Sequence, residues 1–144
     1  MIPEFDSDGL LPVGIHTATL EEFFERFARF QRSDRRLRVC EGLQRLVRET
    51  QGTSIVRKII VGGSLVTNKA EPNDFDCILV LDPSIVGREL RPFEYNLVSR
   101  KHARRIYGGD VLAALDGSQA MEEFLEFFQS TREGKSLGVV EIAI

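Results

Sequence analysis

The sequence predicts an α+β fold, with a short mixed β-sheet and helices packed mainly on one face of that sheet. Segments with a helical spacing of apolar residues alternate along the chain with β-branched runs typical of strands. The length of 144 residues suits one domain with one core, and no repeat, low-complexity tract or linker divides it. We therefore expect a single domain over residues 1–144, whose first 18 residues form an extended N-terminal arm.

Composition and charge narrow the classes of partner. The 19 basic and 22 acidic residues leave a formal net charge of -3, so no overall field draws the protein to nucleic acid or to an anionic membrane. No apolar run approaches the ~20 residues of a membrane helix. The N-terminus lacks the basic and apolar blocks of a signal peptide. Cys40 and Cys77 lie far apart in apolar runs and predict reduced, buried thiols. Together these features predict a cytoplasmic protein.

Two helices are predicted after the arm. The first starts at a capping box, in which Thr19 is followed three residues later by Glu22. Its apolar positions form an aromatic stripe that we interpret as core: Leu20, Phe23, Phe24, Phe27 and Phe30. The second helix starts at Ser33 or Asp34 and ends near Gly52. Its apolar side carries Leu37, Cys40, Leu43, Leu46 and Val47.

The start of the second helix is rich in arginine, with Arg32, Arg35, Arg36 and Arg38. Clusters of this kind usually face solvent or pair with carboxylates, and Glu21, Glu22 and Glu25 are nearby candidates. We therefore expect these arginines to be solvated or ion-paired rather than to bind phosphate.

The pattern changes to that of strands at Ser54. A β-branched run from Ile55 ends at Gly62-Gly63 and predicts a buried strand. A second strand is predicted over residues 75–81, after the turn signal of residues 71–74 and before Asp82-Pro83.

Two more helices and two more strands are predicted in the last third of the chain. Residues 88–105 are expected to be helical after Pro92, and residues 106–115 to form a third strand that Gly108-Gly109 weakens. Ser118 is expected to cap a helix that ends at Gly134. The apolar side of this helix carries Met121, Phe124, Leu125 and Phe128. Residues 137–144 predict a closing strand.

Two carboxylates carry the clearest chemical signal. Side chains alternate along a strand, so Asp74 and Asp76 share one face while Phe75 points to the other. Carboxylates at this spacing can converge on one divalent ion, or on two ions about 4 Å apart, as phosphoryl transfer requires. The simpler interpretation is a turn at Asp74 and a buried Asp76 that finds an arginine partner. Both remain open, since a buried carboxylate needs a partner of one kind or the other.

A glycine-rich loop precedes these carboxylates. A strand that ends in Gly63-Ser64 and enters a helical turn exposes backbone N–H groups to which phosphate oxygens could bind. Thr67 and Lys69 follow and would add a hydroxyl donor and a positive charge. The loop fits neither the GxxxxGK[ST] pattern of a Walker loop nor the GxGxxG dinucleotide fingerprint.

The segment VGGSLVTNKAEPNDFDCILVLD resembles the signature of the polymerase-beta-like nucleotidyltransferase superfamily. The chain as a whole resembles a family of small, functionally uncharacterised prokaryotic proteins within or beside that superfamily. LPVGIHTATLEEFFERF, GGSLVTNKAEPNDFD and FFQSTREGKSLGVVEI carry this second resemblance. The resemblance implies a nucleotidyltransferase-like fold, in which Gly63 and Ser64 hold a nucleoside triphosphate (NTP) and Asp74 and Asp76 bind Mg²⁺, or Mn²⁺ in its place.

The superfamily pattern also implies a third carboxylate on a later strand, which holds metal and acts as the base. Asp110 is the candidate and Asp116 a weaker substitute. Two glycines precede Asp110, which departs from the usual apolar-Asp-apolar strand, and an ordinary turn is the competing interpretation.

Two functions follow as expectations. The first is Mg²⁺-dependent transfer of a nucleoside monophosphate (NMP) from an NTP to a hydroxyl of a protein, an RNA or a small molecule. The second is a catalytically inactive binding module of the same fold, such as the partner-binding component of a toxin–antitoxin or phage-defence system. At this size no separate acceptor-recognition domain remains, which favours a protein partner or a homodimer that supplies the missing surface.

Overall fold

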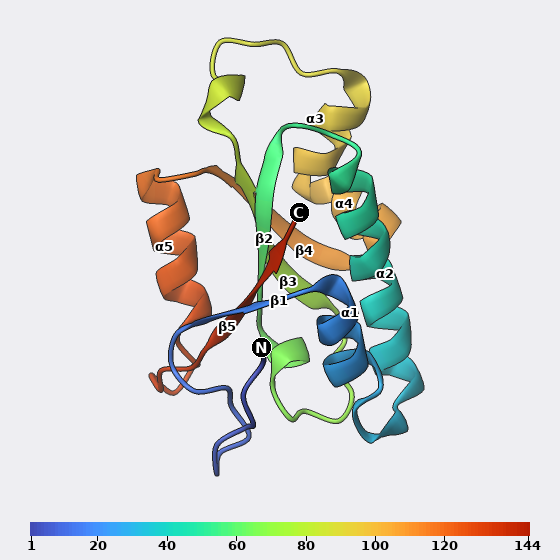
Figure 1. Ribbon diagram of the computed structural model, residues 1–144, viewed down its shortest axis with the longest axis vertical. Coiled ribbons are helices and arrows are strands. Elements are labelled where there is room, and N and C mark those ends of the chain that lie inside the picture. Colours follow the sequence, from blue (N-terminus) through green and yellow to red (C-terminus); the bar gives the residue numbers. More distant parts are fainter.

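A five-stranded mixed sheet organises the chain, which the computed structural model describes over residues 1–144 (Figure 1). The strands are β1 (Ile15–Ala18), β2 (Val56–Gly62), β3 (Phe75–Leu81), β4 (Gly109–Leu115) and β5 (Val139–Ala143). Their order across the sheet is β1-β5-β2-β3-β4. The outer pairs β1–β5 and β3–β4 are parallel, and β2 is antiparallel to both β3 and β5. The predicted α+β class and mixed sheet are confirmed.

The helices lie mainly on one face of the sheet, as predicted. They are α1 (Leu20–Phe23), α2 (Asp34–Gln51), α3 (Pro92–Val98), α4 (Arg100–Tyr107) and α5 (Gln119–Phe128). Figure 1 shows α1 to α4 on one side of the sheet and α5 alone on the other. The buried apolar side chains divide in the same way, with 26 in the larger core cluster and five, Phe128 among them, in the cluster beneath α5.

Helix starts follow the predicted caps. The hydroxyl of Thr19 accepts a hydrogen bond from the N–H of Glu22, and the Glu22 carboxylate accepts one from the N–H of Thr19. The hydroxyls of Ser33 and Ser118 cap α2 and α5 by accepting from the N–H groups of Arg36 and Met121. The predicted aromatic helix is less regular, because α1 continues as a π-helical turn over Phe24–Ala28 and a 3-10 turn over Phe30–Arg32.

Two predicted boundaries were wrong, and the predicted arm is not extended throughout. The arm turns at residues 6–10, where the N–H of Gly9 donates to the carbonyl of Asp6, and its extended residues 15–18 pair with β5 as strand β1. The third strand begins at Gly109 rather than residue 106, because Gly108 ends α4 in the left-handed conformation at φ 76°. Helix α5 ends at Phe128 rather than Gly134, and an isolated bridge between Ser130 and Ser136 follows.

The structure also describes the two cysteines and the apolar character of the helices. Cys40 and Cys77 are free and buried, as predicted. None of the helices combines the length and the apolar character that crossing a membrane would take.

Candidate nucleotide site

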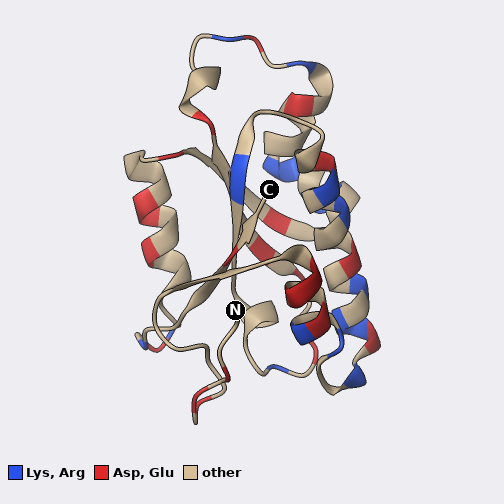
Figure 2. Cartoon of the chain, in the orientation of Figure 1, with Lys and Arg blue, Asp and Glu red and all other residues tan.

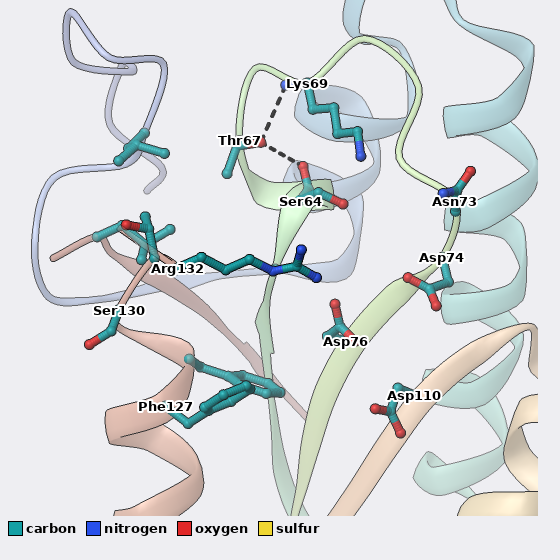
Figure 3. Close-up of a pocket in the computed structure, with 15 residues that line it drawn as sticks. Ser64, Thr67, Lys69, Asn73, Asp74, Asp76, Asp110, Phe127, Ser130 and Arg132 are labelled. Atoms are coloured by element: carbon teal, nitrogen blue, oxygen red, sulfur yellow. Dashed lines mark hydrogen bonds between the residues drawn. The ribbon is translucent and has the colours of Figure 1, made fainter. Parts of the chain in front are cut away.

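A cleft of about 730 Å³ opens where β2 ends and β3 and β4 begin (Figure 3). All seven residues that the sequence singled out line it: Gly63, Ser64, Thr67, Lys69, Asp74, Asp76 and Asp110. The far wall comes from the end of α5 and the segment that leads to β5. The structure therefore brings the glycine loop and the three carboxylates into one site.

The register of three strands positions the acids. Asp76 pairs with Gly62 across the antiparallel β2–β3 ladder and with Asp110 across the parallel β3–β4 ladder. Side chains of paired residues on neighbouring strands point to the same face of a sheet. Asp74 lies in the bend just before β3, and all three acids line the cleft. Asp110 is a strand residue, so the competing interpretation as an ordinary turn was wrong.

Gly63 brings the loop against the central acid. Its φ of 73° is a conformation that glycine adopts without strain. A Cβ at this position would lie 2.3 Å from Oδ2 of Asp76, which is well inside van der Waals contact. The backbone can approach the carboxylate this closely only because residue 63 has no side chain.

The rest of the loop is fixed by Arg36, whose side chain is fully buried. Its guanidinium donates to the carbonyls of Phe27 (3.2 Å), Leu65 (2.9 Å), Thr67 (2.7 Å) and Lys69 (3.0 Å from Nε). The expectation that this arginine is solvated or paired with a carboxylate was wrong. Four carbonyl groups satisfy it instead, because guanidinium is a fork of five donors.

Thr67 and Lys69 differ in their availability for a ligand. The Thr67 hydroxyl donates to the carbonyl of Ser64 at 2.8 Å and accepts from the N–H of Lys69 at 3.2 Å (Figure 3). The Thr67 hydroxyl is therefore already hydrogen-bonded within the loop. The Lys69 side chain is exposed and forms no ion pair, so its charge is available to an anion.

Two arginines of α4 neutralise two of the three acids. Arg100 donates to both oxygens of Asp110, at 2.6 and 2.8 Å, and Arg104 donates to Asp74 at 2.9 Å. Figure 2 shows the acidic positions of β3 and β4 next to helices that carry basic residues. The sequence predicted helix over this stretch, but nothing in the pattern linked the two arginines to these acids.

Asp76 has neither an ion pair nor a side-chain hydrogen bond. Burial raises the pKa of this carboxyl to about 6, and repulsion from Asp74 and Asp110 adds to the rise. Arg104 and Arg100 offset part of it. Asp76 is thus the acid in the cleft that most needs a cation or a proton.

The donor chemistry suits a divalent ion, because Mg²⁺ prefers carboxylate oxygens. In the arrangement shown, however, no three His, Cys, Asp or Glu side chains converge on a point where they could hold a metal ion. Asp110 and Asp74 are turned to their arginines instead. The three carboxylates are suitable ligands for Mg²⁺ and line one cleft. Arg100 and Arg104 compete with a metal ion for Asp110 and Asp74.

The residues of the far wall were not assigned to the site from the sequence; they are Phe127, Phe128, Ser130, Thr131, Arg132 and Leu137. Phe128, predicted to face inward, is buried, whereas its neighbour Phe127 is 74% exposed. The available signal was that Phe127 falls outside the inward-facing positions of its helix, which leaves an aromatic ring with no core to join.

The fold and the cleft define a small α+β protein with a glycine loop apposed to three acids. The chain belongs to DUF6932, a family of unknown function, whose family model matches residues 3–143. Neither the search of curated proteins nor the search of solved structures gave a match.

Proposed function

We propose that this protein binds an NTP in the cleft and transfers its NMP group to a hydroxyl acceptor. The observation that carries the proposal is the close approach of Gly63 to Asp76, which puts a phosphate-binding type of loop against an acid that has no partner. The resemblance to the polymerase-beta-like nucleotidyltransferases gives the same assignment.

The loop and its charges would hold the triphosphate. Backbone N–H groups after Gly63 and the hydroxyl of Ser64 supply donors, and Lys69 supplies a positive charge. Asp74 and Asp76 would hold Mg²⁺, or Mn²⁺ in its place, together with Asp110 once Arg100 releases it. The bound ion would neutralise phosphate charge as the transfer proceeds.

Asp110 would serve as the base. The acceptor oxygen attacks the α-phosphorus, its proton passes to Asp110, and the bond to the leaving pyrophosphate breaks. This role requires Arg100 to give up at least one of its two hydrogen bonds to Asp110. The acceptor class (protein, RNA or small molecule) and a protein partner or second copy of the chain belong to the same proposal. So does a location in the cytoplasm, where NTPs are abundant and free thiols stay reduced.

A second candidate is an inactive binding module of the same fold, such as the partner-binding component of a toxin–antitoxin or phage-defence system. The pairing of Asp110 with Arg100 and of Asp74 with Arg104 favours it. Guanidinium groups that hold the acids permanently would replace the metal and leave no base.

One experiment separates the candidates. The wild type and an Asp110→Asn variant are incubated with α-phosphate-labelled NTPs, Mg²⁺ and cell lysate, and NTP binding is measured in parallel by calorimetry. Label transfer that Asp110→Asn abolishes, with NTP binding retained, supports the enzyme. NTP binding without transfer by the wild type supports the inactive module. The absence of NTP binding overturns the enzyme and leaves a module that binds only its partner.

A further inference from the structure

The wall of the cleft opposite the glycine loop combines an exposed aromatic ring with a free cation. Figure 3 shows Arg132 reaching across the cleft toward Asp76, with Phe127 below it. We propose that Phe127 is the platform on which the base of the nucleotide stacks and that Arg132 contacts its phosphates. This inference rests on the proposed function, because it assigns the two ends of the same ligand.

Phe127 lies outside the core cluster beneath α5, although its ring is 6.3 Å from that of Phe128 between centroids. The core beneath α5 is formed by Phe128 with Ile60 and Ile78, and partly buried Phe124 and Leu125 pack against it. Phe127 leaves 74% of its surface exposed, at the rim of the cleft. An isolated exposed apolar side chain is ordinary, but an aromatic ring beside a polar cleft matches the way proteins stack nucleobases.

The platform is held at a fixed place relative to the glycine loop. A Cβ on Gly62 would lie 2.8 Å from the ring of Phe128, so the last turn of α5 packs directly on the end of β2. The N–H of Leu137 donates to the carbonyl of Gln129 at 3.0 Å, and the Ser130–Ser136 bridge follows. Phe127 and Arg132 therefore belong to an anchored segment that adjoins the residues before Gly63.

Two cations on opposite sides of the cleft are free to contact a polyanion that spans its width. Arg132 forms no ion pair or side-chain hydrogen bond, in contrast to Arg100 and Arg104. Lys69 on the opposite side is likewise free. A triphosphate between these two cations would leave its base to the apolar surface next to Arg132, which is the ring of Phe127.

A stacking contact is made with the face of a base, whereas the groups that distinguish the bases lie on the edge. We therefore expect weak base selectivity, with purines bound more tightly than pyrimidines because of their larger area. The chain has no tryptophan, which allows a direct optical test. In the Phe127→Trp variant, ATP with Mg²⁺ should quench the single tryptophan, and inorganic tripolyphosphate with Mg²⁺ should not. Phe93→Trp, at a half-exposed position on α3 outside the cleft, is the matched control and should respond to neither.

Affinities measured by calorimetry complete the test. Phe127→Ala should weaken ATP binding about tenfold and leave tripolyphosphate binding unchanged, whereas Phe127→Tyr should preserve both. Arg132→Gln should weaken the binding of both ATP and tripolyphosphate. Equal effects of Phe127→Ala on ATP and tripolyphosphate, or none on either, would overturn the platform while the proposed function stands. Failure of the wild type to bind any NTP would overturn both.

Discussion

Arg100 donates two hydrogen bonds to the carboxylate of Asp110, and the two residues are separated by only ten positions in the chain. Helix α4 runs from Arg100 to Tyr107, and Gly108 turns the chain back into β4. The same segment therefore delivers both the acid and the cation that neutralises it. A two-hydrogen-bond arginine–carboxylate pair of this kind is stronger than a single contact, so a metal ion that takes Asp110 must displace it.

The first prediction concerns this competition. Arg100→Ala should increase the rise in melting temperature that millimolar Mg²⁺ produces, because Asp110 is then free to join the metal site. Thermal unfolding with and without Mg²⁺ measures the effect. Lys101→Ala, an exposed neighbour on the same helix, should leave the metal response unchanged. A response no larger in Arg100→Ala than in the wild type would show that Asp110 does not take part in metal binding.

The second prediction follows from the raised pKa of Asp76. The pKa in the folded state is about 6, above the 3.8 of a free carboxyl, so protonation of Asp76 stabilises the fold. That stabilisation is complete below about pH 4 and is lost as the pH rises through about 6. Asp76→Asn, which mimics the neutral form, should therefore stabilise the metal-free protein at pH 7 by about 1 kcal/mol after solvent screening, and by little at pH 4.

Urea denaturation of the variant and the wild type at both pH values gives this difference. Asp110→Asn is the matched control, because it removes an acid that already has a partner. It should not stabilise the protein at pH 7, since Arg100 would lose its partner. Equal stabilisation by both substitutions would contradict the assignment of Asp76 as the acid without a partner.

The third prediction concerns the buried guanidinium of Arg36. Arg36→Met should lower the free energy of unfolding by about 3 kcal/mol, because four carbonyl groups around a buried side chain lose their donor. Arg38→Met, exposed on the same helix, should change it by less than about 0.5 kcal/mol. Denaturation curves decide the point, and similar small losses for both variants would contradict the role of Arg36 in holding the loop.

The fourth prediction separates backbone strain from crowding at Gly63. Gly63→Ala should destabilise the protein by about 2 kcal/mol and weaken ATP binding, because its methyl group meets Asp76 and its φ is unfavourable for alanine. Gly87 has a similar φ of 81° with nothing near its missing side chain. Gly87→Ala should therefore cost only about 1 kcal/mol and leave ATP binding intact. Equal effects of the two on ATP binding would exclude a direct role for the Gly63–Asp76 contact.

The parts of the fold that the sequence predicted are those set by neighbours along the chain. A capping box needs only residues three apart, and β2 and β3 each contain an apolar run, over residues 59–61 and 77–81, with turn residues beyond the strand ends. The approach of Gly63 to Asp76 was also predictable, because strand ends and side-chain alternation constrain it, whereas Asp110 was expected in the site only from the resemblance to the nucleotidyltransferase superfamily. Gly108 was ambiguous, since the same residue can weaken a strand or end a helix.

The features that could not be predicted depend on contacts between distant segments. Three of the four carbonyl partners of Arg36 lie about 30 residues away along the chain, and an arginine gives no local sign that it will be buried. Phe127 and Arg132 join the cleft only because α5 and β5 return to the end of β2. Likewise, the pairing of Arg104 with Asp74 spans 30 residues and depends on how α4 crosses the sheet.

Strand β5 lies between β1 and β2, so residues 15–18 enter the sheet only through residues 139–142. This pairing joins segments more than a hundred positions apart, and closing so long a loop is slow because its entropy must be lost before any contact forms. The edge of the sheet should thus be the last part to assemble during refolding. In hydrogen-exchange pulse labelling, amides of β2 and β3 should gain protection before those of β1 and β5.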